Sequence, residues 1–385
     1  MNTKCKAFFI LLLLTAELFS ACGIIPYPSS PPPPPPPHFE LLYATGLRQI
    51  QGLQLNTATG ALSTATTTPS PNTGLGTTAT MVADPAGKFL FVYDTEGEAI
   101  DVFAINSTTS ALTAISGSPF PAAGIGAPGG LAIDTSGKFL HVAGDFGIDV
   151  FAINGTSGVL TLVSGSPFAD DNGPLGVVAA PPGKFIYTSD IGQGQAATIS
   201  GFSVDSASGA LMPVPGSPFS TLANGSPFYL AAHPSGQFLY AGIPSTNSVE
   251  VWRIDGATGS LALLPGFPLV LRPNNIAFIS SIVADPSGKF LYVSDDFGDI
   301  FGFTVNANSG TLTAMPGSPF FTFSITDQLF VDPTGRFLYS PAGPFISGFS
   351  IDTTSGVPTT LSDSPFAGGA GLTIPATLTF AKGSS

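Results

Sequence analysis

The side chains that could do acid–base chemistry are few in this sequence. Of 385 residues, 24 are Asp or Glu and 11 are Lys or Arg, so charged residues make up only 9% of the chain. Asp145, Asp190 and Asp295 are candidate general bases, because a carboxylate can take a proton from an attacking water. Arg48 and Arg272 are candidate partners, because a guanidinium can stabilise the negative oxygen that forms when a carbonyl group is attacked. These five residues are the most plausible catalytic set that the sequence offers.

Histidine and cysteine add little to this set. The chain is built from a repeated unit, described below, and His141 stands at a strand position that the other copies fill with Phe or Tyr. This predicts that His141 packs in the core. A role as general base is the alternative. His233 takes the place of a turn aspartate and is expected to be exposed, and His38 lies in a linker. We therefore expect no metal site, since no cluster of His and Cys can form.

Two motif matches fail on their context. Residues 124–129 satisfy G-x-G-x-x-G, but no predicted helix follows them that could present its N-terminus to a phosphate. Residues 295–299 are rich in Asp, yet they lack the fixed oxygen positions and the terminal Glu of a calcium loop. The sequence therefore predicts no cofactor.

The composition excludes whole classes of protein. Hydrophobic residues make up 43% of the chain and include 32 Phe, which is ample for a large core and excludes a disordered chain. The net charge of −13 argues against nucleic acid or an anionic membrane surface as a partner. We expect a monomer.

The N-terminus has the features of an export signal. Lys4 and Lys6 precede an apolar run at 7–16, which is too short to cross a hydrocarbon layer of about 30 Å as a helix. Small residues stand directly before Cys22, as in bacterial lipoprotein signals. We expect residues 1–21 to be a signal peptide and Cys22 to carry a lipid that anchors the protein to a membrane of the cell envelope. Cleavage without lipidation and an uncleaved anchor are the alternatives.

A proline tract separates this signal from the rest of the chain. Pro31 to Pro37 in a polyproline II helix would form a stiff spacer of about 20 Å. We expect residues 22–38 to be a lipid anchor and stalk, and residues 39–385 to be one folded domain.

That domain consists of a repeated unit. The element Asp-Pro-x-Gly-Lys-Phe-Leu-Tyr and its variants place turn glycines at 87, 137, 183, 236, 288 and 335. A second element, Ile-x-Val-Phe-x-Ile-Asn/Asp, begins at seven positions between 50 and 346. Each unit contains four short β-branched or aromatic runs bounded by turn residues, and no stretch has a helical period. Four-stranded units at this spacing predict a β-propeller.

The two ends of the domain supply the seventh unit. Residues 41–44 match a second strand without its preceding turn, and residues 375–380 match a missing innermost strand. Pairing of these segments would close the ring and remove its open edges. The fold class expected is all-β: a seven-bladed propeller of four-stranded antiparallel blades, closed by N- and C-terminal strand pairing. The Phe that recurs once in each unit is expected to pack one blade against the next.

The loops should divide the charges between two faces. Lysines and aspartates balance each other in the turns between first and second strands, which predicts solvated turns. The opposite face collects Asp94, Glu96, Glu98, Asp145, Asp170, Asp171, Asp190, Asp295, Asp296 and Asp299, with Arg48 and Arg272 as its clear cations. We expect an acidic face at one mouth of the central channel. Its carboxylates either form turns in water or bind a cation or another ligand.

The repeat resembles a known family. Residues 285–295, Asp-Pro-Ser-Gly-Lys-Phe-Leu-Tyr-Val-Ser-Asp, and the Ser/Thr-Gly-x-Leu segments are similar to those of the seven-bladed lactonase family and of YVTN-repeat surface propellers. Cytoplasmic members of the lactonase family hydrolyse 6-phosphogluconolactone. The resemblance covers Leu41 to Phe380, and the matching residues are turn and packing residues, which specify architecture rather than activity.

Two functions from different classes remain open. The preferred hypothesis is a non-enzymatic display module that binds a protein, polysaccharide or small molecule at the acidic face. The alternative, implied by the resemblance, is a hydrolase that opens a (sugar) lactone ring without a metal cofactor, using Arg48, Arg272 and one of the three aspartates. We prefer the binding module because two arginines offer little to a phosphate and because turn and packing residues dominate the repeats.

Overall fold

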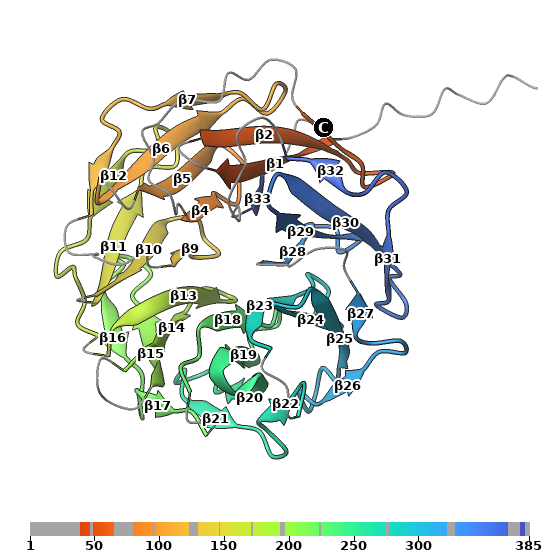
Figure 1. Cartoon of the computed structure of the whole chain (residues 1–385). Coiled ribbons are helices and arrows are strands. Elements are labelled where there is room, and N and C mark those ends of the chain that lie inside the picture. Colours follow the sequence, from red (N-terminus) through yellow and green to blue (C-terminus); the bar gives the residue numbers. More distant parts are fainter. Residues whose placement is uncertain are drawn as a thin grey trace, which may run out of the picture. The chain divides into compact units, whose positions relative to one another are not determined.

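Seven antiparallel sheets follow one another along the chain, and each is built from one copy of the repeat. The computed structural model describes residues 39–46, 49–64, 80–94, 97–122, 130–145, 147–170, 172–192, 197–222, 225–273, 277–321, 328–368 and 378–381. The sheets are arranged in a ring with their innermost strands toward the centre (Figure 1). The expectation of a seven-bladed all-β propeller is confirmed.

The first three blades comprise the following strands. Blade 1 contains β4 (Thr80–Ala83), β5 (Phe89–Asp94), β6 (Ala99–Ile105), β7 (Leu112–Ala114) and β8 (Phe120–Pro121). Blade 2 contains β9 (Leu131–Ile133), β10 (Phe139–Gly144), β11 (Gly147–Ile153) and β12 (Leu160–Leu162). Blade 3 contains β13 (Pro174–Ala180), β14 (Phe185–Asp190), β15 (Thr198–Val204), β16 (Leu211–Pro213) and β17 (Phe219–Ser220).

The remaining blades follow the same plan. Blade 4 contains β18 (Tyr229–Ala232), β19 (Phe238–Ile243), β20 (Ser248–Ile254), β21 (Leu261–Leu263) and β22 (Leu269–Val270). Blade 5 contains β23 (Ile279–Ala284), β24 (Phe290–Asp295), β25 (Asp299–Val305), β26 (Leu312–Ala314) and β27 (Phe320–Phe321). Blade 6 contains β28 (Phe330–Val331), β29 (Phe337–Ala342), β30 (Phe345–Ile351), β31 (Pro358–Thr360) and β32 (Phe366–Ala367). Blade 7 contains β33 (Leu378–Ala381), β1 (Phe39–Gly46), β2 (Gln49–Asn56) and β3 (Leu62–Thr64).

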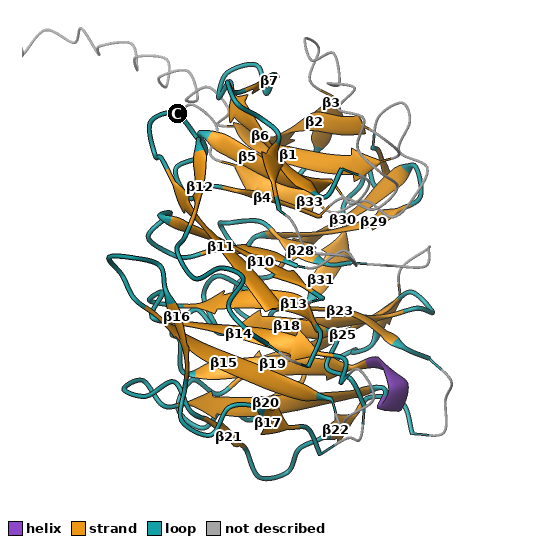
Figure 2. Ribbon diagram, turned by 90° about the vertical axis from the view of Figure 1, so that its left-hand side faces the viewer, coloured by secondary structure: helices purple, strands orange, loops and turns teal. Residues whose placement is uncertain are grey.

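Helical structure is almost absent from the described part of the chain. It holds one short 3-10 helix, η2 (Pro244–Thr246), drawn in purple in Figure 2. No helix among these residues is long and apolar enough to cross a membrane.

Five blades contain a strand that the sequence did not predict. After the outer strand, the Pro-Phe or Pro-Leu segment turns back and pairs with the start of the third strand, as in Ser248↔Val270 and Val249↔Leu269 of blade 4. Each of these strands has two residues, which is too short for a period-2 pattern to reveal. They matter for function because each one carries the chain to the loops that lead to the next blade.

The ring closes where its two ends meet, as expected. In blade 7, β33 pairs antiparallel with β1, and Leu378 lies opposite Ala44. Closure gives β1 a partner on both sides, so β1 is not left as an open edge and blade 7 has its four strands.

The turns between first and second strands are not the solvated charge pairs that the sequence suggested. Asp134, Asp285 and Asp332 are at most 4% exposed. In blade 2, Oδ1 of Asp134 accepts hydrogen bonds from the backbone N–H groups of Lys138 (2.9 Å) and Phe139 (2.8 Å). The expectation was wrong because the carboxylate caps its own turn rather than neutralising a lysine, which is what the local geometry of an Asp turn favours.

His233 is buried as well, contrary to expectation. It is 4% exposed, and its Nε2 donates to the carbonyl oxygen of Gly288 in blade 5 at 2.8 Å. The backbone N–H of Ser235 donates to its Nδ1 at 3.0 Å. Histidine therefore takes over the capping role of the turn aspartate and also joins blade 4 to blade 5.

The recurring Phe of each turn packs against the next blade, as predicted. A Cβ atom added to Gly158 of blade 2 would lie 2.7 Å from Cδ1 of Phe89 in blade 1. Equivalent glycines at 209, 259, 310, 356 and 60 face Phe139, Phe185, Phe238, Phe290 and Phe337 in the same way. The Ser/Thr-Gly segment of the repeat is thus explained by contact between blades. One junction lacks this glycine: Ser110 of blade 1 faces blade 7. In blade 7 the position of the turn Phe is held by Leu41, which has a smaller side chain.

Buried tyrosines form a second set of contacts between blades. Tyr187 donates to the carbonyl oxygen of Gly259 at 2.8 Å, and Tyr43, Tyr292 and Tyr339 make the equivalent bond. Each of these four tyrosines lies opposite a glycine on the third strand, as in Tyr187↔Gly201. A Cβ atom at Gly201 would lie 3.0 Å from Cε1 of Tyr187, so the glycine leaves room for the ring.

His141 occupies the same position in blade 2 and is packed in the core, as expected. It is 0% exposed, and neither ring nitrogen has a hydrogen-bond partner among the described residues. Burial lowers the pKa of His141 from 6.5 to about 4, and the charge of Asp134 opposes this shift only in part. Its burial leaves no access for a substrate, so the structure gives no support to a role as general base.

This histidine predicts a loss of stability in acid. Between pH 6.5 and 4 the unfolded chain binds a proton at His141 that the folded chain does not bind, so acidification favours unfolding. We expect a loss of about 3 kcal/mol in the free energy of unfolding over this range relative to His141→Phe. Phe is the matched replacement because Phe91 holds this position in blade 1, also opposite a valine. Urea unfolding of both proteins at pH 7 and pH 4 measures the difference. If acidification lowers the free energy of unfolding equally in both proteins, the prediction is wrong.

Candidate functional site

The face that could carry chemistry is the one formed by the blade-to-blade links and by the loops between second and third strands, here called the link face. Second strands end on this face and third strands begin on it, which places Asp190, Asp295 and Asp299 there. Arg48 and Cys22 were also singled out from the sequence, and both lie outside the described residues, as do Glu96 and Asp171.

Arg272 and Asp295 are brought together in blade 5. Arg272 follows β22 in the link from blade 4, and its Nε donates to Oδ2 of Asp295 at 2.8 Å. Its Nη2 forms a second ion pair with Oδ2 of Asp299, and its Cζ lies 5.3 Å from the centre of the Phe301 ring. The guanidinium is therefore held on three sides. Its side chain is 25% exposed, so water can reach it.

The two aspartates of this cluster differ in what they can do. Asp295 is 0% exposed, and its Oδ1 accepts the backbone N–H groups of Phe297 (3.1 Å) and Asp299 (3.0 Å). Burial raises the pKa of the Asp295 carboxyl, and the hydrogen bond from Arg272 opposes that shift. The side chain of Asp299 is 14% exposed. Asp295 can therefore orient the arginine, while Asp299 can meet a solvent molecule.

Asp299 belonged to the acidic face expected from the sequence but was not singled out as a site residue. Its signal was a departure from the repeat, because the third strands of the other six blades begin with uncharged residues: Gln49, Ala99, Gly147, Thr198, Ser248 and Phe345. A charge where other blades have none could have identified it.

Asp190 lies in a different cluster, buried in blade 3. It is 0% exposed and accepts hydrogen bonds at Oδ2 from Ser200 (2.7 Å) and Thr198 (2.7 Å). The hydroxyl of Ser200 also lies 3.3 Å from Oδ1 of Asp170, and Thr188 donates to that second carboxyl at 2.8 Å. Burial, and then the charge of Asp170, raise the pKa of Asp190 well above its ordinary value. This pair ties the link from blade 2 to blade 3, but solvent does not reach it.

The acidic face is therefore only partly solvated. Asp170, Asp190 and Asp295 are at most 5% exposed, whereas Asp145 is half-buried in the loop after β10. Asp145 belongs to blade 2, so Arg272 and Asp295 are the sole members of the sequence-based set that the described structure brings into contact. Among the described residues, no group of three or more His, Cys, Asp or Glu side chains could hold a metal ion.

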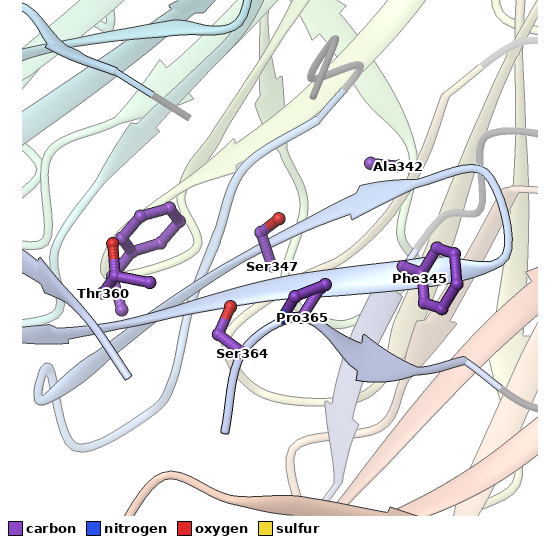
Figure 3. Close-up of a pocket in the computed structure, with 7 residues that line it drawn as sticks. Ala342, Phe345, Ser347, Thr360, Ser364 and Pro365 are labelled. Atoms are coloured by element: carbon purple, nitrogen blue, oxygen red, sulfur yellow. The ribbon is translucent and has the colours of Figure 1, made fainter. Parts of the chain in front are cut away.

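A pocket of about 180 Å³ lies elsewhere, at the outer part of blade 6. Figure 3 shows Phe345, Ser347, Ser364 and Pro365 among its lining residues. Its lining contains no titratable side chain, and its volume is below that of usual ligand sites. It does not have the groups needed for hydrolysis.

Similar proteins have been named for lactone hydrolysis. A 6-phosphogluconolactonase of Pectobacterium carotovorum is 30% identical to the chain over 146 residues, which cover 35% of the chain and 42% of that protein. A second, from Pectobacterium atrosepticum, is 27% identical over the same shares. The match thus spans less than half the length of these curated relatives.

Solved structures share the fold over nearly the whole chain. A protein from Lactobacillus plantarum has a TM-score of 0.71 at 19% identity, covering 89% of this chain and 99% of that one. The periplasmic gluconolactonase of Pseudomonas aeruginosa has a TM-score of 0.68 at 18% identity, with the same coverage.

The family itself is settled by a match over most of the domain. The model described as lactonase, 7-bladed beta-propeller, matches residues 47–168 and 177–373. The preference for a display module that binds a protein or polysaccharide is therefore wrong, because the matching family and the curated relatives are lactonases. The chain belongs to the lactonase family of seven-bladed β-propellers.

Proposed function

We propose that this protein is a lactone hydrolase whose site is the cluster of Arg272, Asp295 and Asp299. One observation carries the proposal: Arg272, whose side chain is 25% exposed, is fixed between two carboxylates on the link face. This brings a cation and a possible general base into contact, which is the combination that hydrolysis of an ester bond needs.

The different exposures of the Asp295, Asp299 and Arg272 side chains give each residue its role in the proposed reaction. The Asp299 carboxylate takes a proton from a water molecule as the water oxygen attacks the lactone carbonyl carbon. Nε and the buried Nη2 of Arg272 face the aspartates, so the two N–H donors of Nη1 remain for the carbonyl oxygen as it becomes negative. The ring C–O bond then breaks, and the leaving oxygen takes the proton from Asp299. The product is an open-chain hydroxy acid.

Asp295 is a positioning residue in this scheme. Both of its oxygens are occupied, one by Arg272 and the other by backbone N–H groups. It fixes the direction of the guanidinium before substrate binds. The arginine therefore loses less conformational entropy on binding.

The test is hydrolysis by the full chain of a panel of γ- and δ-lactones, followed by acid release in a pH-stat. We expect at least one lactone to open faster than in the same buffer containing heat-denatured protein. A panel with no catalysed member would overturn the proposal.

We also propose that the protein is exported and held at a membrane of the cell envelope by a lipid on Cys22. The basic start, the short apolar run and the small residues before Cys22 support this. Expression in a bacterium should place the protein in the membrane fraction, with a mature mass that begins at Cys22 and includes acyl chains. Cys22→Ser should move it to the soluble fraction or leave the signal uncleaved, and an unchanged mass and location would contradict lipidation.

A further inference from the structure

Three exposed phenylalanines lie on the segments that adjoin the Arg272 cluster. Phe278, Phe297 and Phe321, here called the aryl collar, are 51%, 47% and 69% exposed. Single apolar residues are normal on a protein surface, but several large ones on adjoining segments next to a charged group point to a binding site.

Backbone groups connect one member of the collar to the cluster and a second member to Asp296, the residue that follows Asp295. Phe278 donates its N–H to Oδ1 of Asp296 at 2.8 Å, and its carbonyl oxygen accepts the N–H of Asp296 at 2.9 Å. Phe297 donates its N–H to Oδ1 of Asp295 at 3.1 Å. The link from blade 4 is thereby fastened to the turn that carries both Asp295 and Phe297.

Strand pairing places the third member of the collar. Phe321 is the register partner of Asp299, and paired residues project from the same side of a sheet. A fourth ring, that of Phe301, lies against the guanidinium of Arg272. The carboxylate and the cation of the cluster therefore both have aromatic neighbours.

The charge around the cluster is unsuited to an anion. Asp295 and Asp299 more than offset the charge of Arg272, and Asp296 adds a further negative charge. The other basic side chains of the described residues belong to the opposite face: Lys88, Lys138, Lys184, Lys289 and Arg336 in the turns, and Arg253 near the far end of β20. A phosphate brought to the link face would meet like charges without a free cation among the described residues.

We propose that the lactone opened at this site is uncharged and carries an apolar alkyl or aryl substituent, which lies against the aryl collar while its carbonyl oxygen meets Arg272. The inference rests on the proposed lactonase activity and deepens it. It assigns a substrate class different from the phosphorylated sugar lactone for which the curated relatives are named.

The test compares three δ-lactones with the full chain: δ-decalactone, glucono-δ-lactone and its 6-phosphate, each corrected for spontaneous opening. We expect kcat/KM to be at least 10-fold higher for δ-decalactone than for the 6-phosphate. Phe278→Ala should raise KM for δ-decalactone about 10-fold, the effect of one lost aromatic contact, with little change in kcat. The matched control is Phe228→Ala, which is 45% exposed and likewise directly precedes the first strand of its blade. It should leave both constants unchanged.

The outcomes separate this inference from the proposed function. Preference for the 6-phosphate, or equal effects of Phe278→Ala and Phe228→Ala, would overturn the inference and leave the lactonase activity standing. If no lactone is opened, binding of an alkyl-substituted δ-lactam, measured by calorimetry, tests recognition by itself. Binding that Phe278→Ala weakens and Phe228→Ala does not would uphold the apolar site, and absence of binding would overturn it.

Discussion

Replacing Asp299 by asparagine should lower kcat for lactone hydrolysis by about 10²- to 10⁴-fold, the range that a general base contributes. Asparagine has the size of aspartate, and its Oδ1 can still accept a hydrogen bond from Arg272. It cannot take a proton from water at neutral pH, so the chemical step is lost while the cluster is kept. Steady-state kinetics with the best lactone of the panel measure the effect.

The control for this variant is Asp296→Asn, which changes a neighbouring carboxylate of the same turn. Asp296 accepts the backbone N–H of Phe278 at 2.8 Å, and an asparagine oxygen can accept it as well. We expect this control to keep its kcat within a factor of about two, since Asp296 forms no ion pair with Arg272 in the described structure. An Asp299→Asn protein with near-normal kcat would remove Asp299 from the mechanism.

A large loss of stability is expected on substitution of Gly158, where two blades meet. Gly158 has a φ of +76°, and a Cβ atom there would lie 2.7 Å from Cδ1 of Phe89. Gly158→Ala should lower the free energy of unfolding by about 2–5 kcal/mol, which combines left-handed backbone strain with overpacking. The buried Phe89 ring is only 6% exposed and has little space into which to move.

Gly155 offers a control within the same hairpin. A Cβ atom at Gly155 would meet nothing within 4 Å, so Gly155→Ala should change the free energy of unfolding by no more than about 0.5 kcal/mol. Urea unfolding midpoints of the full chain give the comparison. If both substitutions lower the free energy of unfolding equally, Phe–Gly packing between blades does not contribute to stability.

The residues that repeat and the residues that do not repeat have different roles. Phe89, Gly158 and Asp134 recur in most blades, and each of them packs one blade on the next or caps a turn. Arg272 and Asp299 have no counterpart at the same positions of the other blades, and they form the candidate site. In a propeller, departures from the repeat are therefore a better guide to chemistry than the repeat itself.

Exposure was the property that the sequence predicted least well. His233 and the turn aspartates were expected in water and are buried, because their side chains cap the backbone of the turn. Asp190 was expected on a solvated face and lies in a buried network with Asp170. Polar residues at strand ends have the same sequence pattern whether a link covers them or not.

The sequence by itself determined the number of blades, the four main strands of each, the residues that pack them and the closure of the ring. These features repeat locally, so a period of about 50 residues and the identity of turn residues were enough. Only the tertiary structure decided that Arg272 meets Asp295 and Asp299. Arg272 lies in the link after β22, Asp295 ends β24 and Asp299 begins β25, and these segments come together when blade 4 packs on blade 5. Such a contact depends on how two repeats are placed in space, and no pattern within one repeat encodes it.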